Sequence, residues 1–371
     1  MIRLENVTKR YPDGTEAVKG VSFEVKEGEL CVFLGPSGCG KTTTMKMINL
    51  LIPITSGKIY IDEADNTTID ENELRRNIGY AIQEIGLFTH MTVGQNIETV
   101  PALKGWSKTE RRERAEKLLR LVRLNPGEFI DKYPNELSGG QRQRVGVARA
   151  LGADPPILLM DEPFGAIDPI NRVELQSEFL KIQEQIKKTI IFVTHDIHEA
   201  IKMGNKIALM KDGVLVQYDT PANLLYRPKD EFVEGFVGVD RALKGLQLLR
   251  VKEVMTGSPS TAKPEDRVKD VRKRMRQSDN DLLPVVGKDG KFVGCIGIED
   301  VESGQKVKDI VKPLTATITV NSVLNEALSV MLSSGRKVLP VVSESAELVG
   351  ILSFDAIQKA LQEAAQTGES K

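Results

Sequence analysis

The sequence predicts an α/β fold made of two unlike parts, and three observations lead to this prediction. Over residues 1–238 short apolar segments alternate with polar or amphipathic ones, which is typical of a sheet covered by helices. A glycine-rich string at residues 35–42 follows one of these apolar segments. After residue 250 the chain repeats itself at an offset of about 56 residues, which indicates a duplicated small module.

Length and composition narrow the class of protein. A chain of 371 residues is long enough for two or three domains, and 40% hydrophobic with 28% charged residues is typical of a folded, soluble protein. The net charge of −1 provides no field that would attract nucleic acid, so no nucleic-acid partner is expected. Cys31, Cys39 and Cys295 show no CxxC spacing and fit a reducing cytoplasm. No signal core or membrane-spanning stretch is expected, so any membrane role needs a partner.

The strands and one helix of the first part can be placed from the pattern of apolar residues. Lys108–Arg123 is a charged helix with an apolar stripe at Leu118, Leu119 and Val122. The N-terminus also begins as a strand. The other expected strands are Leu30–Leu34, Ile78–Ile82, Ile157–Met160, Ile190–Thr194 and Ile207–Met210.

Residues 35–42 read Gly-Pro-Ser-Gly-Cys-Gly-Lys-Thr and match the phosphate-binding pattern G-x-x-x-x-G-K-[ST]. They stand between an expected strand and a helix starting near Lys41, which is the context that the motif needs. Lys41 would place its charge at the β- and γ-phosphates of ATP, and the Thr42 hydroxyl would bind Mg²⁺. Cys39 is a small residue that fits the loop, and a bulky thiol reagent there is expected to block nucleotide binding. The expected nucleotide-binding residues are Gly35, Pro36, Ser37, Gly38, Cys39, Gly40, Lys41, Thr42 and Thr43.

An apolar strand, Ile157–Met160, ends in two carboxylates. Asp161 is placed to hold the Mg²⁺ shell, and Glu162 to polarise the attacking water as general base. The reaction expected of these groups is attack of water on the γ-phosphate, without a covalent intermediate.

Residues 137–141 read Leu-Ser-Gly-Gly-Gln, and with the phosphate loop this string resembles the ATPase subunits of ABC transporters. The resemblance covers residues 1–238 and implies an ABC-type nucleotide-binding domain with a helical subdomain. It implies a homodimer that sandwiches two ATP molecules. In that dimer Ser138, Gly139 and Gly140 would reach the γ-phosphate on the partner.

The same resemblance assigns further roles. Gln83 corresponds to the catalytic glutamine that senses Mg²⁺ and contacts the permease, and His195 to the switch histidine that bonds the γ-phosphate. Asp168 corresponds to the residue that links the two sites, and Tyr11 to the aromatic that stacks on adenine. The chain departs from the family pattern in having Ile167 where leucine is usual.

Three alternatives stand beside this interpretation. His195 and His198 are spaced so that both could contact a metal, although two histidines without a third ligand form a weak pattern. The chain could be a non-transport ABC ATPase of translation or repair, although it has one nucleotide site and no coiled coil. It could also be a slow regulatory nucleotide sensor, which the presence of Glu162 and His195 disfavours.

The repeat pairs Val251–Val254 with Val307–Ile310 and Leu283–Val286 with Leu339–Val342. Each copy is expected to run helix, strand, turn, strand, helix, and the pair resembles a tandem of CBS modules with an α+β fold and a regulatory role. The expected parts after residue 238 are a linker at 239–250, modules at 251–306 and 307–363, and a polar tail at 364–371.

Two stretches look like those of ATPases from glycine betaine, carnitine and choline importers, namely Lys41–Asn49 and Ile85–Val93. Neighbouring importers of amino acids, methionine or anions are the alternative. The resemblance implies separate transmembrane permease subunits, and indirectly an extracellular or periplasmic solute-binding domain. It also implies peripheral attachment to the cytoplasmic side of the membrane.

The ligand of the CBS pair is left open by the sequence. The usual ribose-binding pattern is imperfect, because Gly297 replaces the hydroxyl residue ahead of Asp300, and because Asp355 comes one position early in the second copy. Cyclic di-AMP, which would not need that pattern, is one candidate. A second candidate is an anionic membrane surface, released as salt screens it; the alternative is a plain solvated helix face. The cationic helix in question carries Arg267, Lys269, Arg272, Lys273, Arg274 and Arg276.

Overall fold

A computed structural model of the chain describes residues 1–82, 86–165, 167–257, 259–278, 282–297, 306–313 and 316–369. The chain divides into two compact units. The first holds Met1–Leu224 with Lys229–Val233, and the second holds Leu225–Pro228 with Glu234–Lys371. Within the described residues no helix is both long and apolar enough to cross a bilayer.

The first unit is built on a six-stranded sheet whose inner strands are parallel. Every residue of β3, β7 and β8 is buried, as expected for strands covered by helices on both faces. The expected strands are confirmed, with ends that differ by at most one residue. In spatial order the sheet contains β10 (Val214–Asp219), β9 (Lys206–Lys211), β3 (Leu30–Leu34), β8 (Thr189–Val193), β7 (Ile157–Asp161) and β6 (Ile78–Ala81).

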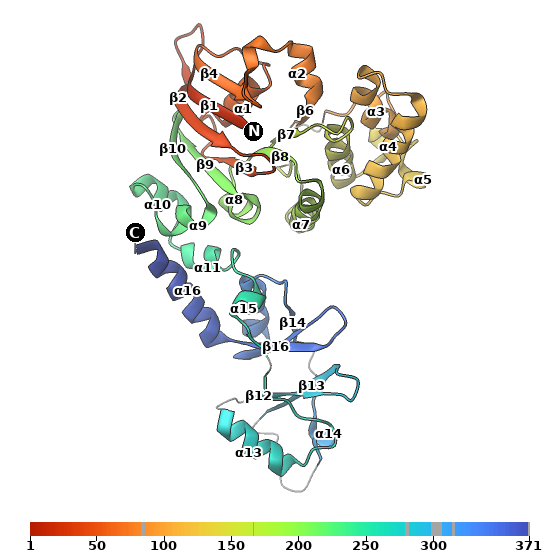
Figure 1. Cartoon of the computed structure of the whole chain (residues 1–371), viewed down its shortest axis with the longest axis vertical. Helices are drawn as coiled ribbons and strands as arrows, with labels where there is room; N and C mark the ends of the chain where they lie inside the picture. Colours follow the sequence, from red (N-terminus) through yellow and green to blue (C-terminus); the bar gives the residue numbers. More distant parts are fainter. Residues whose placement is uncertain are drawn as a thin grey trace. The chain divides into compact units, whose positions relative to one another are not determined.

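A second, antiparallel sheet covers one side of this unit (Figure 1). Between the sheets lies α1 (Lys41–Ile48), whose Met45, Met47 and Ile48 are fully buried in one apolar cluster with residues of both sheets. The phosphate loop is therefore fixed at both ends by core elements. The second sheet contains β2 (Glu16–Val25), β1 (Ile2–Arg10), β4 (Ser56–Ile61) and β5 (Ala64–Asp65).

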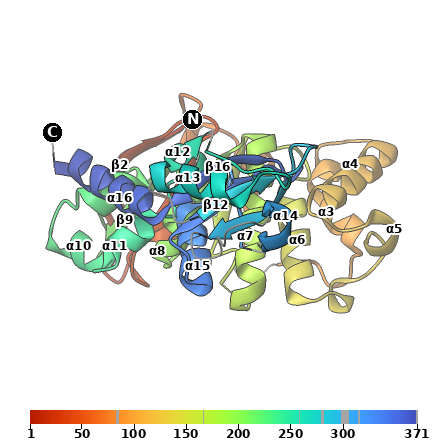
Figure 2. The same cartoon turned by 90° about the horizontal axis from the view of Figure 1, so that it is seen from below.

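Helices α3 to α6 lie together at one side of the first unit in both views (Figures 1 and 2), and form the expected helical subdomain. The helix expected at Lys108–Arg123 is observed as Lys108–Leu121, and it ends early because Arg123 adopts a left-handed conformation with φ 56°. The elements of this region are η1 (Asn66–Thr68), α2 (Glu71–Asn77), α3 (Val93–Leu103), α4 (Lys108–Leu121), α5 (Pro126–Phe129), η2 (Pro134–Glu136) and α6 (Gly139–Ala150).

Two helices follow the strands that carry the expected catalytic residues. The longer, α7 (Pro169–Ile186), follows β7, and α8 (Ile197–Met203) follows β8. The chain then continues through α9 (Pro221–Tyr226), α10 (Glu231–Val237) and α11 (Arg241–Gly245).

The second unit contains two apolar clusters, one for each repeat. The second repeat has the expected order of helix, strand, turn, strand and helix. The expectation of a closing helix in the first repeat falls on residues outside the described part. The first repeat contains β11 (Thr256–Gly257), α13 (Val268–Ser278), β12 (Leu282–Val286) and β13 (Phe292–Gly297). The second contains β14 (Ile318–Thr319), α15 (Leu324–Ser334), β15 (Val338–Val342), β16 (Leu348–Ser353) and α16 (Phe354–Glu369).

The two repeats exchange their opening helices. In the first, α12 (Val251–Val254) places Val251 in the cluster of the second repeat, and the Val251 N–H donates to the Ser322 carbonyl at 2.9 Å. In the second, α14 (Val307–Ile310) places Val307 in the cluster of the first, and its N–H donates to the Asp266 carbonyl at 3.0 Å. Neither cluster is complete without the other repeat.

Candidate functional site

The phosphate loop connects β3 to α1, and close approaches to backbone require its glycines. A Cβ on Gly35, where φ is +144°, would lie 2.1 Å from the Met210 carbonyl oxygen. A Cβ on Gly40, where φ is +103°, would lie 2.4 Å from that of Ala17. Because Gly40 precedes α1 without a side chain to cap it, the first N–H groups of the helix are left for an anion. Residues 36–38 form the exposed rim of the loop.

Lys41 is held inside this loop, with 6% of the residue exposed. Its Nζ donates to the carbonyl oxygens of Gly35 at 2.6 Å and Pro36 at 2.8 Å, and lies 3.7 Å from Cys39 Sγ. The cation is thus already at the loop and needs only a rotation of its side chain to reach a phosphate. Burial raises the pKa of the Cys39 thiol against the opposing effect of Lys41, so a thiol reagent meets a hidden and largely protonated sulfur.

Thr42 and Asp161 meet at the start of α1 and the end of β7. The Thr42 hydroxyl donates to Asp161 Oδ1 at 3.0 Å. Burial raises the pKa of the Asp161 carboxyl, and the hydrogen bond from Thr42 opposes this effect. A hydroxyl and a carboxylate oxygen that converge beside a phosphate loop suit Mg²⁺, which prefers one or two protein oxygens and the oxygens of its nucleotide. The residues present therefore fit the ion that the sequence implies.

Glu162 and His195 lie side by side because β7 and β8 are parallel neighbours. His195 Nδ1 is 3.2 Å from Glu162 Oε1, and the two side chains are 59% and 21% exposed. Glu162 has a left-handed φ of 43°, and its N–H donates to the Val193 carbonyl at 3.0 Å. Because β3, β7 and β8 are parallel, both residues lie at the same edge of the sheet as Asp161 and the phosphate loop.

The first turn of α6 carries Ser138, Gly139 and Gly140. Ser138 caps this helix, because its Oγ accepts from the Gln141 N–H at 3.3 Å while Gln141 Oε1 accepts from the Ser138 N–H at 2.9 Å. Ser138 and Gly139 are exposed. Asp168 caps α7 in a similar way and is also exposed, with its Oδ1 accepting from the Asn171 N–H at 3.1 Å. These residues face outward, as residues that act across a dimer must.

Tyr11 follows β1 and is half-buried. The Nζ of Lys9 lies 5.2 Å from the centre of the Tyr11 ring and donates to the Pro53 carbonyl at 2.7 Å. A cation this close is attracted to the face of the ring and holds it in place. Sequence reasoning missed the role of Lys9, although this residue stands only two positions before Tyr11 in the sequence. Gln83, expected at the end of β6, lies outside the described residues.

The structure adds no third ligand to His195 and His198 among the residues that it describes. Among the described residues no three His, Cys, Asp or Glu side chains are grouped to hold a metal ion. His198 is exposed, and its backbone N–H donates to Asp196 Oδ1 at 2.8 Å as part of the start of α8.

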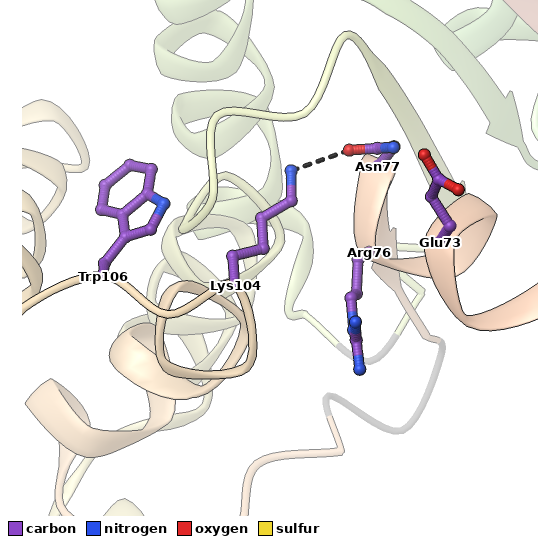
Figure 3. A pocket seen from close by; sticks show the side chains of 5 residues that line it. All are labelled: Glu73, Arg76, Asn77, Lys104 and Trp106. Atoms are coloured by element: carbon purple, nitrogen blue, oxygen red, sulfur yellow. Dashed lines mark hydrogen bonds between the residues drawn. The ribbon is translucent and has the colours of Figure 1, made fainter.

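A pocket of about 400 Å³ lies between α2 and the connection from α3 to α4. Figure 3 shows Lys104 reaching across to Asn77, with Trp106 on one side and Glu73 on the other. Lys104 Nζ donates to Asn77 Oδ1 at 2.7 Å. Arg76 completes the lining. The pocket thus combines an indole with charges of both signs.

Comparisons with known proteins agree with this geometry. The family model described as ABC transporter matches residues 18–165, and that described as CBS domain matches residues 251–303 and 307–363. Among solved structures, the dimeric bacterial ABC transporter cassette MJ0796 is similar, with a TM-score of 0.55 and 39% identity over 60% of this chain and 99% of that one.

Two curated relatives from Bacillus subtilis (strain 168) are similar over nearly their whole length. The choline transport ATP-binding protein OpuBA is 46% identical over 95% of this chain and 94% of its own. The glycine betaine/carnitine/choline transport ATP-binding protein OpuCA is 45% identical, with the same coverage. The chain therefore belongs to the family of ATP-binding subunits of osmoprotectant ABC importers that carry a C-terminal CBS pair, and its enzymatic activity is ATP hydrolysis coupled to transport.

Proposed function

We propose that this chain drives the uptake of quaternary ammonium osmoprotectants, namely glycine betaine, carnitine and choline. The observation that carries the proposal is similarity at 45–46% identity across both units, because the relatives named for these solutes match the CBS pair as well as the ATPase. Importers of amino acids, methionine or anions remain the alternative to be tested.

In the proposed reaction Glu162 is the general base and His195 contacts the γ-phosphate. Their separation of 3.2 Å supports a shared task, since one group can orient the other. Lys41 and the loop N–H groups bind the phosphates, and Tyr11 receives the adenine. Thr42, Asp161 and Gln83 are the proposed ligands and sensor of Mg²⁺, which when bound neutralises charge on the phosphates.

We further propose that two chains sandwich two ATP molecules. The exposed start of α6 supports this arrangement, because a helix N-terminus with unfilled N–H groups favours a phosphate from a partner. The similar cassette MJ0796 is described as dimeric. Ser138, Gly139 and Gly140 are the residues proposed to complete the partner's site, with Asp168 linking the two sites.

The permease is proposed to dock at the pocket lined by Glu73, Arg76, Asn77, Lys104 and Trp106. An indole supplies a large apolar contact, and the mixed charges around it suit a short helix or loop with polar ends. With this contact, the chain is proposed to be a peripheral subunit at the cytoplasmic side of the membrane. A solute-binding domain outside the membrane would select the solute.

For the CBS pair the proposed ligand is cyclic di-AMP in the region where the repeats meet. The exchange of α12 and α14 supports regulation through this region, because a ligand that separates the repeats must disturb both cores. Isothermal titration of the full chain with cyclic di-AMP tests this proposal, and the absence of heat over a range of concentrations would reject it.

The alternative ligand is an anionic membrane surface, and fewer cationic residues at α13 are available for it than the sequence indicated. Arg274 is only half exposed, and it is bonded to Asp266 and to the Thr261 carbonyl within its own repeat. Four residues of the set are exposed and are left for lipid, namely Arg267, Lys269, Arg272 and Lys273. The Arg276 side chain is outside the described part.

The experiment that tests the main proposal is uptake of labelled glycine betaine before and after a salt upshift. It uses cells that lack other betaine uptake and carry the wild type, Glu162→Gln, or the exposed control Glu174→Gln. Uptake that rises with salt in the wild type and control, and is lost in Glu162→Gln, is expected. No uptake in any strain, with amino acid uptake instead, would reassign the solute.

A further inference from the structure

A set of buried hydrogen bonds lies directly behind His195. The site residues expected from the sequence take no part in these bonds. Thr194 Oγ1 donates to Glu199 Oε2 at 2.5 Å and accepts from the Asp196 N–H at 3.1 Å. Gln176 Nε2 donates to Glu199 Oε1 at 3.0 Å. Thr194, Glu199 and Gln176 are 2%, 6% and 5% exposed. A buried carboxyl is costly unless it is bonded, so each of these contacts is required.

The direction of these bonds is fixed by a cation. Lys202 Nζ donates to Gln176 Oε1 at 3.3 Å and to Ser177 Oγ at 3.0 Å. Because the Gln176 oxygen faces Lys202, its nitrogen must face Glu199. Both oxygens of Glu199 therefore accept a hydrogen bond, one from α7 and one from the His195 turn. The network joins α8, the turn before it, and the helix that Asp168 caps.

We propose that Glu199 is a positioning residue for ATP hydrolysis, which holds the turn of Thr194, His195 and Asp196 so that His195 stays beside Glu162. The inference rests on the proposed role of His195 at the γ-phosphate. His195 is itself 59% exposed at its side chain, so few contacts restrain the ring from the solvent side. Its position depends on the backbone beneath it. Glu199 accepts from the Thr194 hydroxyl, and that hydroxyl accepts from the Asp196 N–H, so the contact with Glu199 is passed to the residues on both sides of His195.

The substitution Glu199→Gln disturbs this network without changing its volume. One oxygen becomes an NH₂ group, which must face either Thr194 or Gln176. If it faces Gln176, two donors meet, and Gln176 can relieve this only by turning its oxygen away from Lys202. If it faces Thr194, the hydroxyl must stop donating to residue 199, and its buried proton loses its acceptor. Either arrangement loosens the turn.

The test combines turnover with a direct view of the histidines in the full-length chain. The chain has only three histidines, so histidine-labelled protein gives a simple ring spectrum that His90→Gln, His195→Gln and His198→Gln assign. Nucleotide affinity is measured by titration with ATP in the presence of Mg²⁺. The variants are Glu199→Gln, Thr194→Val and the conservative Thr194→Ser, with the exposed Glu174→Gln on α7 as control.

We expect Glu199→Gln and Thr194→Val to lower kcat by about tenfold to a hundredfold, as for a catalytic group displaced by an ångström, with ATP affinity within about twofold. Their His195 signal should shift or broaden, while Thr194→Ser and Glu174→Gln resemble the wild type. Wild-type turnover with an unmoved His195 signal in both disruptive variants would overturn the inference. If His195→Gln itself leaves turnover intact, the role of His195 fails, and the ring spectrum still decides whether Glu199 holds the turn. If Glu199→Gln does not fold, the two threonine variants carry the test.

Discussion

The two compact units carry their charged side chains in different places. In the ATPase unit Lys41 at the start of α1 and Asp161 at the end of β7 are each only 6% exposed, and the fold fixes their positions. In the CBS unit both clusters consist of apolar side chains, and Arg272 and Lys273 stand exposed on α13. Chemistry that needs exact placement is thus built around a buried sheet, whereas the CBS repeats keep Arg272 and Lys273 on the surface, where these charges respond to the surroundings.

The largest expected effect comes from the glycines that let the loop approach the sheet. Gly35→Ala places a Cβ 2.1 Å from a backbone oxygen, so we expect the ATPase unit to lose several kcal/mol of stability, about the upper end for single substitutions. Gly38→Ala is the matched control, because it shares a positive φ but meets nothing within 4 Å. Thermal unfolding of both variants measures the difference, and equal midpoints would show that the close approach is unimportant.

The second prediction concerns the cost of keeping Asp161 buried. Because burial raises its pKa, the native state holds the proton more tightly than the unfolded chain does. Stability therefore falls as pH rises from the ordinary aspartate pKa through the raised native one, and the whole cost is present at pH 7. We expect Asp161→Asn to unfold at a higher temperature than the wild type at pH 7, with the gap closing in acid, while Mg²⁺-dependent turnover is lost.

Unfolding curves of the nucleotide-free proteins at several pH values check this prediction. The midpoint temperature should rise by roughly 2–4 °C for each kcal/mol of burial cost that the substitution removes. The asparagine keeps an oxygen that can accept from Thr42, so the hydrogen bond at 3.0 Å is preserved in the comparison. A variant that melts below the wild type at pH 7 would contradict the account.

The same contrast explains what sequence could predict. The phosphate loop and the carboxylates after β7 follow from local strings, because neighbouring positions must act on one phosphate chain. The pair of Glu162 and His195 could be expected once β7 and β8 were assigned. The role of Glu199 behind His195 could not be expected, because its partner Gln176 comes from α7 and packing between elements sets that contact.

In the CBS unit the repeated pattern of apolar residues predicted two similar modules. It could not reveal that α12 and α14 change places, because Val251 and Val307 occupy equivalent positions and either core accepts a valine. It also could not show that Arg274 is bonded to Asp266, since the two residues are eight positions apart and on different elements. The division of the chain at residues 239–250 stays a prediction.

A medium effect is expected at the pocket of Figure 3. Trp106→Ala removes its large apolar wall, so we expect weaker copurification with the permease subunits, by about 2 kcal/mol or more if the indole is a hot spot. Affinity for ATP should not change. Val214→Ala, which trims an exposed apolar side chain on β10, is the control. Equal recovery of the permease with both variants would place the docking surface elsewhere.

The smallest effect is expected on α13. Replacing Arg272 and Lys273 with glutamine removes two exposed charges, each of which contributes about 1 kcal/mol beside an anionic membrane. If lipid contact is the switch, the salt dependence of uptake flattens. Arg274→Gln breaks a bond within the repeat and should lower stability instead. An unchanged salt response in the double variant would leave these residues as a solvated helix face.

Steady-state release of phosphate from ATP, compared between the wild-type chain and Glu162→Gln with permease present, tests the central claim most directly. The claim is that the motifs assemble into one hydrolytic site with Glu162 as its base. We predict a fall of about 10²–10⁴ in turnover for Glu162→Gln with ATP binding retained, which is the range for removal of a general base. Equal rates of phosphate release in the two chains would contradict the account.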